Sequence, residues 1–120
     1  MSINSRVALL RQLLKDSSKL CRSLYPDQLK VDYKEDGQPV TNVDLEINAL
    51  IKSQQMHYFP EDCWYSEEEP FCPKEAVYSW IIDPIDGTSN MVNRCSEFVV
   101  SIALMQKGKL KAAGVINPIT

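Results

Sequence analysis

The sequence predicts an α/β (α+β) fold in which helices and strands are mixed, without the regular βαβ alternation of a doubly wound sheet. Two observations lead to this fold class. Residues 5–59 contain two segments with helical periodicity, and the residues after them contain short apolar runs bounded by turn signals. The chain has 120 residues, 44% of them hydrophobic, so it can bury a core as one small domain or as part of a larger one.

A first helix is expected from Ser5 to Leu24, because apolar residues recur there at helical spacings. The apolar set is Val7, Leu10, Leu13, Leu14, Leu20, Cys21 and Leu24. Pro26 ends this helix. The amino terminus has no continuous apolar core, so it is not a secretory signal, and no run approaches the length of a membrane span.

A short hairpin is expected after the first helix. Residues 29–33 alternate apolar and polar side chains, as a half-exposed strand does, and Glu35-Asp36-Gly37 is a turn signal. The hairpin is expected to end near Val40.

A second helix is expected from Thr41 or Asn42 to about Phe59, where Pro60 ends it. Its apolar stripe consists of Ile47, Leu50, Ile51 and Tyr58. Asp44 follows Thr41 at the spacing of a capping box, and a carboxylate in the first turn suits the helix dipole.

The rest of the chain predicts short strands, at residues 63–65, 80–82, 98–104 and 110–116. Lys107-Gly108 is the turn that makes the last two an antiparallel pair. The chain stops soon after that pair, with no helix to cover the last strand, so the end looks cut.

Charge and cysteine content limit the expected partners and compartment. The formal net charge is -3 and there is no basic block, so neither a nucleic acid polymer nor an anionic membrane is expected as a partner. The four cysteines lack the close pairing of a zinc site and are interpreted as free thiols. Together with the absence of a secretory signal, this indicates the cytoplasm.

The stretch WIIDPIDGTSNM, residues 80–91, contains the main candidate for chemistry. Pro84 lacks an N–H, so the chain is expected to leave the sheet between Asp83 and Asp86, with both side chains near one sheet edge. Two carboxylates so placed repel each other unless a cation holds them. Hard divalent ions such as Mg²⁺ take oxygen ligands of this kind, and the carbonyl of Ile85 is a further one.

An anion site is expected beside this cation site. Gly87 and the polar residues 88–90 are typical of a helix start, where backbone N–H groups favour an anion. Three further acids, Glu67, Glu68 and Glu69, follow the strand at residues 63–65, and a charged loop is the simplest structural interpretation of them. Asp83–Gly87 taken alone is also compatible with a hairpin corner.

Three elements together resemble the inositol monophosphatase superfamily of magnesium-dependent, lithium-sensitive phosphatases. The family pattern W-x-x-D-P-x-D-G-T-x-N-F is met in residues 80–90, with Met91 in place of the aromatic residue. Ser66-Glu67-Glu68 is similar to a second family element, and residues 39–44, PVTNVD, are similar to a third. The resemblance implies a layered α/β sandwich with two amino-terminal helices on a mainly antiparallel sheet, a small phosphorylated substrate and a homodimer.

The resemblance also implies a set of metal ligands. Glu67, Asp83 and the carbonyl of Ile85 would hold one Mg²⁺, and Asp83 and Asp86 would hold a second. Lys34 falls where the family has a mobile loop near a further weak metal, so two or three ions are expected.

Catalytic roles follow from the same resemblance. Thr88 would orient the attacking water, with Asp44 holding the threonine hydroxyl. The backbone N–H groups of Gly87 and Thr88 would bind the substrate phosphate, and Glu68 would act as an acid beside the metals.

Two departures leave the function open. The family's further aspartate for the second metal, in a W-D-x-A-A-G-type motif, does not occur in these residues, so residues 1–120 are expected to be the amino-terminal, metal-binding portion of a longer domain and inactive alone. Residues 93–104 and 66–70 resemble the 3'(2'),5'-bisphosphate nucleotidase branch, whereas residues 87–90, GTSN, are more similar to inositol monophosphatase. The expected function is Mg²⁺-dependent hydrolysis of inositol monophosphate; the alternatives are that nucleotidase and a non-catalytic metal-binding or dimerisation fragment.

Overall fold

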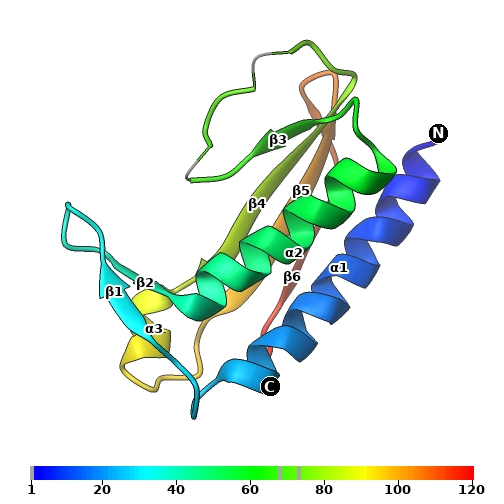
Figure 1. The fold of residues 1–120 in the computed structure, drawn as a ribbon. Coiled ribbons are helices and arrows are strands. Elements are labelled where there is room, and N and C mark those ends of the chain that lie inside the picture. The colour runs from blue at the N-terminus through cyan, green and yellow to red at the C-terminus, as the bar shows by residue number, and fades with distance from the viewer. Residues whose placement is uncertain (1, 68, 73) are drawn as a thin grey trace.

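A computed structural model describes residues 2–67, 69–72 and 74–120 (Figure 1). The helices are α1 (Ile3–Leu24), α2 (Asn42–Tyr58) and the short α3 (Thr88–Val92). The strands are β1 (Val31–Tyr33), β2 (Pro39–Thr41), β3 (Cys63–Tyr65), β4 (Tyr78–Asp86), β5 (Val99–Gln106) and β6 (Lys109–Ile116). In the described residues, none of these helices combines the length and apolarity needed to cross a membrane.

The main sheet has the order β3-β4-β5-β6, and β1 and β2 form a separate hairpin. Strand β3 runs parallel to β4, whereas β4–β5 and β5–β6 are antiparallel. Helices α1 and α2 lie side by side on one face of this sheet, with α1 against β5 and β6 and α2 against β4 (Figure 1). The predicted layered α/β fold, with two helices on a mainly antiparallel sheet, is confirmed.

The hydrophobic core lies between the two long helices and the sheet. Its fully buried side chains include Leu13, Ile47, Ile51, Trp80, Ile102 and Leu104. Two apolar side chains of the predicted elements are not buried: Ile81 is 41% exposed and Tyr58 is 51% exposed. Side chains alternate along a strand, so Ile81 faces away from the helices while its neighbours Trp80 and Ile82 face them.

The second helix begins as its sequence predicts. Thr41 is the N-cap and forms a capping box with Asp44: Thr41 Oγ1 accepts from the Asp44 N–H at 3.2 Å, and Asp44 Oδ2 accepts from the Thr41 N–H at 2.9 Å. The first helix starts slightly earlier than expected, at Ile3. The hairpin is present, but all three residues of β1 are exposed, so the half-exposed pattern expected there is wrong.

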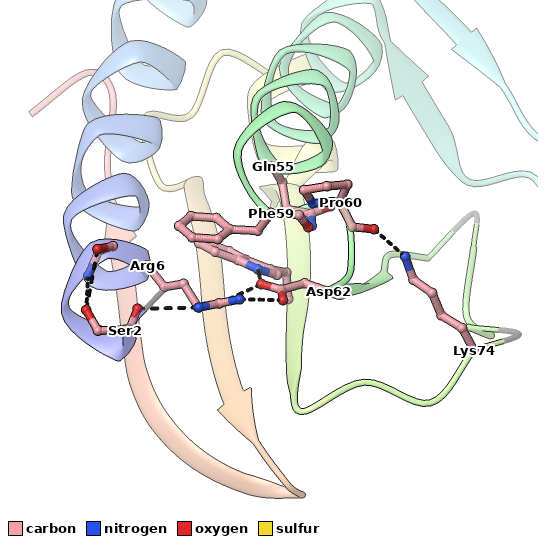
Figure 2. Close-up of polar contacts among 9 residues, drawn as sticks. Ser2, Arg6, Gln55, Phe59, Pro60, Asp62 and Lys74 are labelled. Atoms are coloured by element: carbon pink, nitrogen blue, oxygen red, sulfur yellow. Dashed lines mark hydrogen bonds and ion pairs between the residues drawn. The ribbon is translucent and has the colours of Figure 1, made fainter.

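A buried ion pair joins α1 to the segment after α2. Arg6 Nε and Nη2 each donate to Asp62 at 2.7 Å, and Figure 2 shows the two side chains facing each other. The Arg6 guanidinium also lies over the rings of Phe59 and Tyr78, at 4.3 Å and 3.7 Å from their centroids. Trp80 Nε1 donates to Asp62 at 2.8 Å. Nothing in the helical pattern of the sequence separates this arginine from exposed ones.

The interpretation of all four cysteines as free thiols is wrong. Cys63 of β3 forms a disulfide with Cys72 in the connection to β4. Cys21 and Cys95 are free; Cys95 is exposed, and burial raises the pKa of the Cys21 thiol to about 11. The error has a simple cause: which cysteines meet depends on how the chain folds.

Candidate active site

A β-bulge in β4 brings Asp83 and Asp86 to the same side of the sheet. Asp83 pairs with Ser101 and Asp86 pairs with Val99, so β4 has one residue more than β5 between these pairs. In a regular strand, side chains at this spacing point to opposite faces. The extra residue shifts the alternation of side chains by one position, so Asp83 and Asp86 point to the same side. Both aspartates are exposed.

The expectation that the chain leaves the sheet at Pro84 is therefore wrong. Pro84 interrupts the ladder, because it has no N–H, but pairing resumes at Asp86 and the strand continues to that residue. The predicted outcome for the side chains still holds, since Asp83 and Asp86 lie at one end of the sheet.

A cavity of about 460 Å³ lies at this end of the sheet. Its walls come from the β1–β2 hairpin, the first turns of α2, the residues just after β3 and the bulge with the start of α3. Among the lining residues are Lys34, Asp44, Glu67, Asp83, Ile85, Asp86, Gly87 and Thr88. The fold thus gathers from four segments almost all the residues predicted to form the site. Glu68 lies outside the residues that the structure describes.

The hydroxyl of Thr88 is held at the start of α3. Thr88 Oγ1 lies 2.9 Å from Asp44 Oδ1 and 3.2 Å from the carbonyl oxygen of Ile85. The other carboxylate oxygen of Asp44 accepts from the N–H and the hydroxyl of Thr41, at 2.9 Å and 2.6 Å. Asp44 is locked by its own helix cap and presents one oxygen to Thr88. The predicted contact between Asp44 and Thr88 is present.

Gly87 is required at the turn between β4 and α3. It is the N-cap of α3 and has a φ of 97°, in the left-handed region that favours glycine. A Cβ on this residue would lie 3.0 Å from the carbonyl oxygen of Glu97 and 3.3 Å from Phe98. Both the positive φ and the close approach to residues 97 and 98 disfavour any residue other than glycine at this position.

Negative charge accumulates around Asp83. Although Asp83 is exposed as a residue, neighbouring atoms partly shield its carboxyl from water; this desolvation raises the pKa of the Asp83 carboxyl, the charges of Asp86, Glu67 and Asp44 raise it further, and a backbone hydrogen bond from Ile85 partly offsets these effects. A raised pKa means that the ionised form is disfavoured in the folded protein. A cation bound near Asp83 would relieve this cost.

The donor set suits a hard divalent cation, because carboxylate and carbonyl oxygens are the ligands that Mg²⁺ takes. The carboxylates are not drawn together, however. Within the described residues, no three His, Cys, Asp or Glu side chains converge closely enough to share a metal ion. Glu67 is directed instead to Lys34, whose Nζ lies 3.2 Å from Glu67 Oε1, and the Glu67 side chain is 75% exposed. Binding a metal through Glu67 would require this ion pair to open.

Asn48 lines the cavity and was missed by the sequence reasoning. Its Oδ1 atom is buried, with no hydrogen-bond partner among the described residues. Asn48 lies one helical turn after Asp44 on α2, so the two side chains share one face of the helix. The four-residue spacing from Asp44 is the sequence feature that could have identified Asn48 as a residue of the site.

Comparison with known proteins places the chain in one family. The model of the inositol monophosphatase family matches residues 4–120. The chain is 36% identical over 113 residues to "Nus factor SuhB" of Vibrio cholerae, covering 92% of this chain and 42% of that protein. It is 36% identical over 110 residues to "3'(2'),5'-bisphosphate nucleotidase CysQ" of Haemophilus influenzae, covering 86% of this chain and 40% of that protein.

Solved structures agree with the sequence matches. The fold is similar to that of a Staphylococcal IMPase-I complexed with products, with a TM-score of 0.84 and 27% identity, covering 98% of this chain and 45% of that one. The chain therefore spans less than half the length of these relatives. From the family model, the sequence matches and the shared fold, the chain belongs to the inositol monophosphatase family.

Proposed function

We propose that the protein carrying this chain hydrolyses a small phosphate monoester, most simply inositol monophosphate, in a reaction that depends on Mg²⁺. Phosphatases among its relatives support the reaction class, including "Inositol-1-monophosphatase" of Rhizobium meliloti. Residues 1–120 would supply one wall of the active site and would be inactive alone, because the chain spans less than half of each relative.

The observation that carries the proposal is the placement of the Thr88 hydroxyl beside Asp83 and Asp86 in one cavity. A threonine hydroxyl has one proton to donate and two lone pairs to accept with. Because Asp44 Oδ1 takes the proton at 2.9 Å, the lone pairs of Thr88 Oγ1 remain for a water molecule. A water that donates to Thr88 presents its own lone pair to a phosphorus atom held in the cavity.

Mg²⁺, in two or three sites, is proposed as the cofactor. Glu67, Asp83 and the carbonyl of Ile85 would hold one ion, and Asp83 with Asp86 would hold another. When bound, the ions would lower the pKa of a water and offset the charge on the phosphate oxygens. Two structural neighbours support this choice: an IMPase/NADP phosphatase complexed with Mg²⁺ and phosphate, and a Staphylococcal inositol monophosphatase-1 in a LiCl-soaked inhibitory complex.

The remaining roles are proposed from position. The backbone N–H groups of Gly87 and Thr88, at the start of α3, would donate to the substrate phosphate. Glu68 would act as an acid beside the metals, and Lys34 would lie near a third ion. A homodimer is proposed from the family resemblance, and the cytoplasm is kept as the proposed compartment.

A 3'(2'),5'-bisphosphate nucleotidase is the second candidate. The similarity to the CysQ protein of Haemophilus influenzae favours this candidate, because the chain is as similar to CysQ, at 36% identity, as it is to the SuhB protein. The same carboxylates and the same threonine would serve either substrate, so the two candidates differ only in what surrounds the phosphate.

A phosphate-release panel on the full-length protein tests the proposal. Inositol 1-phosphate and 3'-phosphoadenosine 5'-phosphate are compared with Mg²⁺ and with EDTA, and with added LiCl against NaCl. We expect Mg²⁺-dependent release from the inositol ester, inhibited by lithium at concentrations where sodium has no effect. Preference for the nucleotide would select the second candidate. No release from either substrate would leave a non-catalytic metal-binding or dimerisation module.

A further inference from the structure

The Cys63–Cys72 disulfide closes the segment that contains Glu67. Cys63 lies in β3, which ends at Tyr65, and Cys72 lies nine residues further along the chain. In the described part of residues 66–77 there is neither helix nor strand. The disulfide therefore ties the middle of an irregular connection back to the edge strand of the sheet.

The other contacts of this segment are polar and near the surface. Ser66 and Glu69 exchange backbone hydrogen bonds of 3.1 Å in each direction. The carboxylate of Glu69 pairs with Lys52 of α2, and that of Glu67 pairs with Lys34 of the hairpin. Ion pairs as exposed as these contribute little to stability. The covalent link is thus the strongest constraint described for the segment.

We propose that Cys63 and Cys72 form a thiol–disulfide exchange site whose redox state controls how firmly Glu67 is held at the cavity. The inference rests on the proposed function, in which Glu67 is a metal ligand. It also rests on the proposed cytoplasmic location: in that reducing compartment a disulfide is typically transient and catalytic or redox-sensing, so a disulfide beside a metal ligand fits regulation better than permanent structure.

The two sulfur atoms differ in accessibility, which sets the direction of the exchange. Cys63 is 2% exposed, whereas Cys72 is half-buried in the irregular connection. A thiolate of an external dithiol attacks Cys72 Sγ, the S–S bond breaks, and Cys63 leaves as a thiolate that takes a proton from water. The carbonyl oxygen of Lys74 lies 3.1 Å from Cys63 Sγ and can accept the hydrogen bond of the new thiol.

A second step completes the reduction. The second thiolate of the dithiol attacks the dithiol sulfur that is bonded to Cys72. This releases Cys72 as a thiolate, which is then protonated. The dithiol becomes a cyclic disulfide and supplies the two electrons. Among the described residues, the segment that carries Glu67 then keeps its links to β3 and β4 and its ion pairs with Lys34 and Lys52, but loses its covalent link. A metal ion must order that segment on binding, so metal affinity falls in the reduced state.

The test compares the oxidised full-length protein with protein reduced by dithiothreitol and freed of reductant under nitrogen. Mg²⁺ affinity is measured by calorimetry, and amide hydrogen exchange is followed over residues 66–72. We expect reduction to weaken Mg²⁺ binding by about tenfold, the lower end of effects seen when the support of a metal ligand is lost. Exchange should speed up in this segment but not in α1.

Cysteine variants separate this site from the other thiols. Cys72→Ser should bind Mg²⁺ as weakly as the reduced protein, whether or not it is treated with dithiol. Cys95→Ser is the matched control, because Cys95 is an exposed free thiol away from the segment, and it should keep the full redox response.

Two results would overturn the inference in different ways. Mg²⁺ binding that is tight and equal in both redox states would refute control by the disulfide and leave the proposed function intact. Absence of Mg²⁺ binding in both states would refute the proposed function, and the inference with it. Circular dichroism of the reduced protein is the control that tests whether the fold is retained after reduction.

Discussion

The Thr88 hydroxyl lies 2.9 Å from Asp44 Oδ1, although 44 residues separate them in the chain. The contact joins the first turn of α2 to the start of α3, and Thr41 holds the other oxygen of the carboxylate. The helix cap and the candidate active site therefore use the same aspartate. Asp44 thus caps α2 and also orients the hydroxyl proposed to bind the attacking water.

Removing that hydroxyl should affect turnover far more than metal binding. Thr88→Ala in the full-length protein is expected to lower kcat by about 10²–10⁴-fold, the usual contribution of a positioned proton-transfer group. Thr88→Ser keeps a hydroxyl and should recover most of the activity. Steady-state phosphate release gives kcat, and calorimetry gives the Mg²⁺ affinity. A Thr88→Ala protein with normal kcat would exclude this role for the residue.

The desolvation of Asp83 and the negative charge around it should make the metal-free protein less stable as the pH rises. The pKa of Asp83 is raised in the folded state above its ordinary value of 3.8. Between the ordinary pKa and the raised pKa, the folded state therefore binds more protons than the unfolded state. The free energy of unfolding therefore falls as the pH rises through this window. Asp83→Asn removes this titrating carboxyl, so the free energy of unfolding of the variant should fall less over the same pH range than that of the wild-type protein. Urea denaturation in EDTA at several pH values measures the difference.

Adding Mg²⁺ provides the control for that experiment. The ion should stabilise the wild-type protein at neutral pH and should have little effect on Asp83→Asn. Identical pH dependence of the free energy of unfolding in the two proteins would mean that neither desolvation nor the neighbouring carboxylates raise the pKa of Asp83 in the folded state.

The buried Arg6–Asp62 pair should contribute strongly to stability. Arg6→Ala leaves the Asp62 carboxylate buried without its charge partner, and we expect the free energy of unfolding to fall by about 3–5 kcal/mol. Arg11→Ala, on the exposed face of the same helix, is the matched control and should change it by less than about 0.5 kcal/mol. Chemical denaturation monitored by tryptophan fluorescence suits the measurement, because Trp80 contacts Asp62. Equal stability of the two variants would contradict the importance of the pair.

Local patterns in the sequence predicted most of the fold. Helical periodicity and capping identified α1 and α2 to within a few residues, and the Thr41–Asp44 spacing predicted the capping box. These features depend on neighbours in the chain. The placement of Asp83 and Asp86 at one sheet edge followed from the residues, whereas the resemblance of three motifs to one family predicted the other residues that line the cavity.

Features that depend on distant contacts were not predicted. Pro84 indicated the end of a strand, yet pairing with β5 carries the strand through a bulge to Asp86. The Cys63–Cys72 disulfide and the pairing of Arg6 with Asp62 likewise need the tertiary fold. The ion pair between Lys34 and Glu67 brings together two segments that the sequence describes separately, a hairpin and an acidic loop.

Mg²⁺-dependent phosphate release by the full-length protein, compared with its Asp83→Asn variant, tests the central claim most directly. The substitution removes one negative charge next to Asp86 and changes the side-chain volume little, so the fold should remain intact by circular dichroism. We predict that the wild-type protein releases phosphate only with Mg²⁺ and that Asp83→Asn has no measurable Mg²⁺-dependent turnover. A folded Asp83→Asn protein with wild-type activity would contradict the assignment of this site.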